Sequence, residues 1–185
     1  TALSVRRDTS LSRNILHFTL PASFLVFLFG LIIYIGALYL VNNRLVDTVV
    51  TPEMLAGLRN YTTMQPDQMT EEWFRQTATL LSAQTALTSF FVFAGIMLML
   101  FADPPTQWFT GGSEYTGNNL VIYAAIVLIA AYLLLLMIPP LRAFFQLVPL
   151  PWVFTVAVGL LTLIWMFVQR GIWRSRWFER FLDVE

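Results

Sequence analysis

One apolar stretch of the sequence holds the densest group of side chains that can do chemistry. Its hydroxyl and amide groups belong to Ser82, Gln84, Thr85, Thr88 and Ser89. Such groups inside an apolar helix either hydrogen-bond to neighbouring helices or coordinate an ion. Positions 82, 86 and 89 are small and share one helix face, which favours close helix packing and interhelical hydrogen bonds. Ion coordination along a polar seam that includes Gln84 and Thr88, four residues apart, is the alternative.

The sequence lacks the residue types that most other kinds of chemistry require. It contains no cysteine, and all eleven of its basic residues are arginine, which excludes thiolate metal sites, disulfides and phosphate loops with lysine. His17 is the only histidine, and its position where an apolar stretch begins favours packing over proton transfer. Asp103 precedes Pro104, which favours a solvated acid at a helix end over an ion ligand. We therefore predict no catalytic, cofactor-binding or metal-binding residue in this chain.

Four long stretches without charge determine the fold class. Residues 14–43, 76–102, 115–141 and 143–169 contain no Asp, Glu, Lys or Arg. The chain is only 12% charged, whereas a soluble domain is about 25% charged. A bilayer core of roughly 30 Å requires about 20 helical residues, which each stretch supplies. We predict one all-α membrane domain over residues 1–185, a four-span transmembrane helix bundle with spans at about 15–41, 80–102, 120–138 and 151–168.

The distribution of arginine predicts how the bundle is oriented. Seven arginines lie in the two terminal segments, four lie in the first and third loops, and the middle loop has none. Because positively charged segments stay in the cytoplasm, both termini are expected there, in a plasma (inner) membrane. The long loop of residues 42–79 is then external, with helix starts expected at Thr51-Pro52 and at Asp67 or Thr70. The net charge of zero argues against a nucleic-acid partner.

The connection between the third and fourth spans is rich in proline yet stays apolar. Its characteristic residues are Pro139, Pro140, Arg142, Pro149 and Pro151. The first two prolines are expected to end one helix and the last two to start the next, so that the segment forms a short outer turn close to the bilayer. The aromatic and arginine residues of segment 171–185 are typical of an interfacial anchor in contact with lipid at the inner surface.

Two stretches of the sequence resemble the C-terminal transmembrane region of bacterial cation-transporting P-type ATPases. Residues 11–28, LSRNILHFTLPASFLVFL, are similar to the segment that leads into the seventh helix of that family. Residues 133–170, LLLLMIPPLRAFFQLVPLPWVFTVAVGLLTLIWMFVQR, are similar to its ninth helix, outer turn and tenth helix. The resemblance implies that the chain corresponds to the last four of ten helices, which begin and end in the cytoplasm and have a long external loop after the seventh.

The sequence also departs from that family. The phosphorylation motif Asp-Lys-Thr-Gly-Thr is absent, as are the nucleotide-binding domain and the fourth to sixth helices, which hold most of the family's ion ligands. The resemblance therefore implies a support domain, as a fragment or a separately encoded piece, that packs beside the ion-transport helices and leaves ATP and Mg to other domains. Two alternatives stay open at this point: a small accessory subunit of another membrane complex, and a stand-alone channel or carrier built around the polar seam.

Overall fold

Six helices make up the part of the chain that the computed structural model describes, which is residues 2–62, 70–109 and 117–175, with side chains from residue 19 to residue 174. They are α1 (Ala2–Val46), α2 (Pro52–Arg59), α3 (Glu71–Ala102), α4 (Asn119–Met137), α5 (Pro139–Phe144) and α6 (Trp152–Ser175). No strand occurs within these ranges. Four helices, α1, α3, α4 and α6, are long and apolar enough to cross a membrane. The prediction of an all-helical chain with four spans is confirmed.

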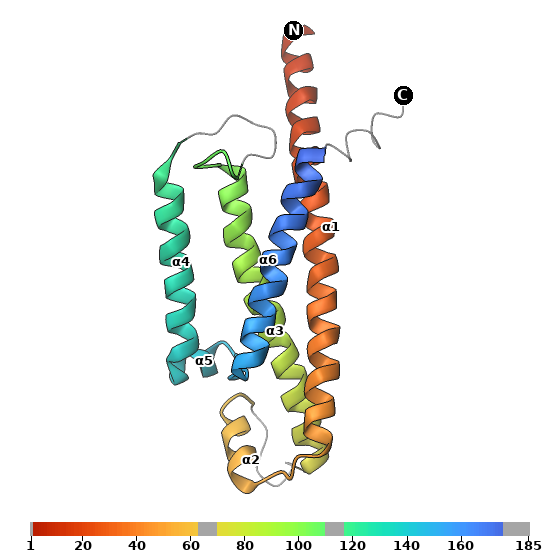
Figure 1. Ribbon diagram of the computed structural model, residues 1–185, viewed down its shortest axis with the longest axis vertical. Coiled ribbons are helices and arrows are strands. Elements are labelled where there is room, and N and C mark those ends of the chain that lie inside the picture. Colours follow the sequence, from red (N-terminus) through yellow and green to blue (C-terminus); the bar gives the residue numbers. More distant parts are fainter. Residues whose placement is uncertain (1, 63–69, 110–116, 176–185) are drawn as a thin grey trace.

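The four long helices form one bundle, with the two short helices at one of its ends (Figure 1). α3 lies at the centre and packs against α1, α4 and α6, while α1 also packs against α6. The beginning of α1 and the end of α6 lie at one end of the bundle, and α2 and α5 lie at the other. An even number of spans produces this arrangement, whichever side of the membrane each end occupies.

Three of the four long helices extend beyond the spans predicted from the sequence. α1 continues through Pro21 without interruption, α3 begins at Glu71 rather than near residue 80, and α6 continues to Ser175. Absence of charge marks the part of a helix that can lie in lipid, whereas backbone hydrogen bonds continue until something interrupts them. Glu71 and Glu72 favour the start of α3, because carboxylates interact favourably with the dipole at a helix N-terminus.

Side-chain caps predicted from the sequence begin α2 and α3. The Thr51 hydroxyl accepts a hydrogen bond from the backbone N–H three residues later (3.4 Å), and Pro52 is the first helical residue. The Thr70 hydroxyl accepts one in the same way (3.2 Å), so Thr70 is the residue that caps α3. α4 has a cap that the sequence analysis did not predict, Asn118. Each cap satisfies an N–H group that the first helical turn leaves unpaired.

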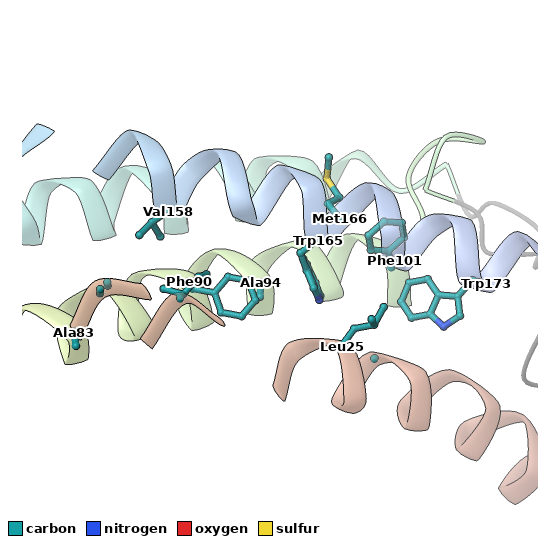
Figure 2. Packing of buried hydrophobic residues seen from close by; sticks show 13 residues of the cluster. Leu25, Ala83, Phe90, Ala94, Phe101, Val158, Trp165, Met166 and Trp173 are labelled. Carbon is teal, nitrogen blue, oxygen red and sulfur yellow. The ribbon is translucent and has the colours of Figure 1, made fainter. Parts of the chain in front are cut away.

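Small side chains of α3 form the centre of the core (Figure 2). Ala83, Ala86 and Ala94 are each at most 1% exposed. Between them, the ring of Phe90 meets Trp165 of α6 edge to face, with the ring centroids 5.9 Å apart. Inside lipid no hydrophobic force drives helices together, so close van der Waals contact at small residues stabilises the bundle instead.

α1 approaches α3 closely at Gly30, which is buried. A Cβ atom at this position would lie 3.1 Å from a ring carbon of Phe91 and 3.2 Å from a methyl carbon of Leu87. These distances are shorter than ordinary van der Waals contact. Because Gly30 has no side chain, α1 and α3 can lie this close together.

The end of α1 is joined to the start of α3 by Arg75. Its guanidinium donates hydrogen bonds to the carbonyl oxygens of Leu45, Val46 (2.6 Å) and Thr48 (3.1 Å). The last carbonyls of a helix have no partner within the helix, and a positive charge is favourable at that end of the helix dipole. Arg75 therefore fixes α1 to α3 at the end of the bundle that holds α2.

Candidate functional site

The five polar side chains of the predicted seam lie on different faces of α3. Thr85 and Ser89 are buried, and Ser82 is half-buried. Gln84 and Thr88 are exposed on the surface of this chain. Residues four apart share a helix face, so the exposed pair and the buried pair lie on two neighbouring faces. The structure does not bring the two pairs together, and a role for Gln84 and Thr88 in an ion path stays a prediction.

Thr85 connects α3 to the segment between α5 and α6. Its hydroxyl accepts a hydrogen bond from the buried backbone N–H of Val148 (3.0 Å) and donates one to the Leu81 carbonyl of its own helix (2.8 Å). A buried N–H without a partner is unfavourable by about 1–3 kcal/mol. Thr85 removes this penalty where the chain returns from α5 to α6.

Ser89 connects α3 to α4. Its hydroxyl donates to the Thr85 carbonyl (2.8 Å) and lies 2.7 Å from the Tyr132 hydroxyl. A serine hydroxyl has one proton, so with that proton directed at the carbonyl, Tyr132 is the donor to Ser89. The Tyr132 ring also packs edge to face on Phe93, at a centroid distance of 5.6 Å. An interhelical hydrogen bond of the kind favoured from the sequence therefore forms at Ser89, whereas Thr85 bonds to the segment between α5 and α6.

The proline-rich connection contains a helix that the sequence analysis did not predict. Pro139 and Pro140 follow the end of α4, as expected, but they also occupy the first positions of α5, where a missing N–H is tolerated. After α5, Gln146 adopts the left-handed backbone conformation (φ 55°), which helps to reverse the chain. Pro149 and Pro151 are exposed, and Pro151 directly precedes α6. The connection is thus a folded unit rather than a simple turn.

Arg142 lies at the centre of this connection and is half-buried. Its Nε donates to the Tyr61 hydroxyl (3.2 Å), and its Nη1 donates to the Leu136 carbonyl (3.3 Å). The first contact joins the segment after α2 to α5, and the second satisfies a carbonyl near the end of α4. Within the described ranges, Arg142 forms no ion pair with a carboxylate.

Two cavities meet at Arg142. The outer cavity, about 780 Å³, lies between α2, the first turns of α3 and α5. The inner cavity, about 360 Å³, lies between α3, α4 and α6. Arg142, Val148 and Pro149 line both cavities, while Thr85 and Ser89 line the inner one and Ser82 the outer one.

Aromatic and cationic contacts close the opposite end of the bundle. The Nε of Arg170 donates to the Trp108 carbonyl (2.9 Å), and its guanidinium lies over the Trp108 ring, 4.6 Å from the centroid. The neighbouring Gln169 is fully buried, and neither atom of its amide has a hydrogen-bond partner among the residues that the structure describes. Burial of an unpaired amide is unfavourable, so the packing around Gln169 must hold it in place. Gln169 was not identified from the sequence as a residue of interest.

The described residues contain no group of three or more His, Cys, Asp or Glu side chains placed to hold a metal ion. Asp103 follows the last residue of α3, so its predicted position at a helix end is confirmed, but it is half-buried and its Oδ2 accepts a hydrogen bond from the Asn118 amide (3.4 Å). The side chain of His17 and residues 176–185 of the expected anchor lie outside the described residues. Within the described part, the arrangement joins helices to one another.

A comparison with known protein families decides what this bundle is. The family model described as "Cation transporting ATPase, C-terminus" matches residues 4–173. The chain belongs to this family. The match covers all four long helices, so the bundle is the C-terminal membrane domain of cation ATPases. Searches of curated proteins and of solved structures gave no match.

Three residues that connect the helices of this cation ATPase domain were not singled out from the sequence. Tyr132 and Tyr61 supply hydroxyl groups, and Val148 supplies a backbone N–H. Tyr132 carries a usable signal, because a phenol within an uncharged stretch requires a hydrogen-bond partner when it is buried. The backbone N–H of Val148 carries no such signal in the sequence, because every residue other than proline has a backbone N–H.

Proposed function

We propose that this chain is the membrane support domain of a bacterial P-type cation pump and packs beside the helices that transport the ion. The family match over residues 4–173 is the observation that carries the proposal. The domain has no catalytic site of its own, because the sequence lacks the phosphorylation motif of these pumps and contains no lysine. In this proposal ATP and Mg bind to the other domains of the pump, to which the resemblance assigns the phosphorylation motif.

The exposed polar face of α3 supports a docking role. Gln84 and Thr88 lie inside the uncharged stretch 76–102, yet both are exposed on the isolated domain. An amide that faces lipid tails is unfavourable because they offer no hydrogen-bond partner. We place the transport helices of the pump against this face, where they supply partners for Gln84 and where the face borders the ion path.

In this proposal both ends of the chain are cytoplasmic, and α2 and α5 lie outside a plasma (inner) membrane. The excess of arginine in the terminal segments supports this orientation. The position of the start of α1 and the end of α6 at the same end of the bundle is compatible with it (Figure 1).

The other two hypotheses have less support. A family match along nearly the whole chain favours a pump domain over an accessory subunit of an unrelated complex. A stand-alone channel through the seam is disfavoured because Thr85 and Ser89 are buried and already paired with Val148 and Tyr132.

Replacing the exposed polar pair tests the docking role. In the complete pump, Gln84→Leu combined with Thr88→Val is expected to lower ATP-driven cation uptake into inverted membrane vesicles about tenfold, the effect of losing one or two interhelical hydrogen bonds. The matched control is Tyr123→Phe, which removes a polar group from an exposed position on α4 and is expected to leave uptake unchanged. Normal uptake by the double variant would contradict docking at this face, and a purified complex without ATPase activity would contradict the proposed function.

A further inference from the structure

The inner cavity between α3, α4 and α6, called here the α4–α6 cavity, is apolar on most of its surface. α3 contributes Thr85 and Ser89 to its lining, α4 contributes Leu133 and Met137, and α6 contributes Thr155. The polar atoms of Thr85 and Ser89 already form hydrogen bonds within the protein. Water occupies a cavity when it finds two or more free polar partners, and an apolar cavity stays dry. The α4–α6 cavity is therefore suited to an apolar ligand.

The cavity lies where two helices of the bundle fail to pack on each other. α4 packs against α3 and α5, and α6 packs against α1 and α3, but α4 and α6 share no substantial contact. Met137 at the end of α4 and Thr155 in the first turns of α6 are both exposed and line the cavity. In a bilayer, the space between α4 and α6 is next to lipid tails. Filling it with an acyl chain recovers the dispersion contacts that an empty cavity loses.

A cationic group lies at the end of this cavity. The half-buried Arg142 lines it, and the hydrogen bonds of its guanidinium go to two neutral oxygens, those of Tyr61 and Leu136. A guanidinium has five N–H groups, and its strongest partners are carboxylates and phosphates, which it binds with two parallel hydrogen bonds. Within the described ranges no carboxylate occupies that position. Among the residues that the structure describes, Arg142 therefore leaves donors available for an anion beside the apolar cavity.

The depth of Arg142 in the membrane matches that of lipid head groups. Trp152, at the start of α6, is 76% exposed, and exposed tryptophan at the end of a span is typical of the membrane interface. Arg142 belongs to the connection that leads to this residue, at the same end of the bundle (Figure 1). Basic pockets between transmembrane helices bind the head groups of anionic lipids, and a volume of about 360 Å³ is within the range of ligand cavities.

We propose that the α4–α6 cavity binds one anionic phospholipid, with its phosphate on Arg142 and an acyl chain between α4 and α6. The lipid completes the contact that the two helices lack and belongs to the leaflet at the end of the bundle that holds α2 and α5. This assignment requires that the helices cross a bilayer and that the space between α4 and α6 faces lipid, and it does not require that the transport helices dock on Gln84 and Thr88.

Lipid titration of the purified, delipidated protein at its full natural length tests the proposal. Native mass spectrometry would count the molecules of dioleoylphosphatidylglycerol or dioleoylphosphatidylcholine that stay bound. The anionic lipid is expected to bind about tenfold more tightly at one site, and Arg142→Gln is expected to abolish that preference, since hydrogen bonds to a charged group contribute about 1.5–3 kcal/mol. The control Arg59→Gln removes an exposed cation from α2 at the same end of the bundle and is expected to leave the preference intact.

Two further variants separate lipid binding from folding. Tyr61→Phe removes a hydrogen bond of Arg142 but keeps the cation, and is expected to retain binding. Thr155→Trp places a large side chain at the mouth of the cavity from an exposed position, and is expected to lower binding of both lipids with Arg142 intact. Equal binding of the two lipids, an unchanged preference in Arg142→Gln, full binding by Thr155→Trp, or displacement of the lipid by millimolar inorganic phosphate would each overturn the proposal.

Discussion

α3 and α4 are both long apolar helices, but they differ in how much of each is buried. Of the most apolar window of α3, 44% is buried within this chain, whereas for α4 the value is 11%. α4 is nonetheless the more apolar of the two: it has no charged residue, while α3 begins with Glu71 and Glu72. Apolarity alone therefore does not determine which helix occupies the centre of this bundle.

The greater burial of α3 follows from its small side chains and from hydroxyl groups that bond to neighbouring segments. α3 presents Ala83, Ala86 and Ala94 to its neighbours and joins them through Thr85 and Ser89. The described surface of α4 consists mostly of exposed large aliphatic side chains, such as those at positions 126, 127, 128, 133 and 134. Lipid is as apolar as leucine, so only close packing and hydrogen bonds distinguish a protein neighbour from a lipid neighbour.

The largest expected effect comes from emptying the core of α3. Phe90→Ala is expected to destabilise the bundle by about 3 kcal/mol, at the low end of the range for buried phenylalanine because the unfolded helices remain in lipid. Leu128→Ala, at a 47% exposed position of α4, is the control and should change little. Reversible unfolding in mixed micelles, followed by tryptophan fluorescence, measures both, and equal effects would contradict the contrast between the two helices.

A smaller effect is expected from overfilling the core around α3. Ala86 is fully buried in the core, and Ala86→Leu adds volume to packed surroundings, which is expected to destabilise the bundle by about 1–3 kcal/mol. The same substitution at the exposed Ala124 of α4 should be neutral, because lipid tails adapt to the larger side chain. A drop in melting temperature in detergent for the α3 variant alone is the expected result. An equal drop for both variants would indicate that α4 is packed against protein.

The smallest effect is expected from removing the hydrogen bond between the Ser89 hydroxyl of α3 and the Tyr132 hydroxyl of α4. The coupling energy between Ser89→Ala and Tyr132→Phe in a double-mutant cycle is expected to be about 0.6 kcal/mol, the average for hydrogen bonds between membrane helices. Thr162→Val is the comparison, because among the described residues the Thr162 hydroxyl bonds to the Val158 carbonyl of its own helix and to no other helix. A coupling of zero would show that the 2.7 Å contact does not hold α4 in place.

Local features of the fold were predictable because local residues determine them. Uncharged length identified the four spans, and Thr51 and Thr70 act on N–H groups three residues away. The α5 helix was missed because dense proline normally breaks helices. Pro139 and Pro140 are tolerated only because they occupy the first positions of α5.

The polar contacts of α3 were only partly predictable. Helical spacing showed that Gln84 shares a face with Thr88, and Thr85 with Ser89, but not which face points into the bundle. That choice depends on the rotation of α3, which Ala83 and Ala86 set against α1 and α6. The partners of Thr85 and Ser89 lie 63 and 43 residues away, and no pattern along the chain records a pairing over such distances.

The contact between Arg75 and the end of α1 couples the stability of two helix ends. The carbonyl oxygens that close α1 are satisfied by a side chain about thirty residues further along the chain. Without Arg75, the carbonyl oxygens at the end of α1 would have to find water or another partner, because a helix leaves its last carbonyls unpaired. The last turn of α1 and the first turns of α3 are therefore stabilised as one unit, and loss of the Arg75 side chain affects the ends of both helices.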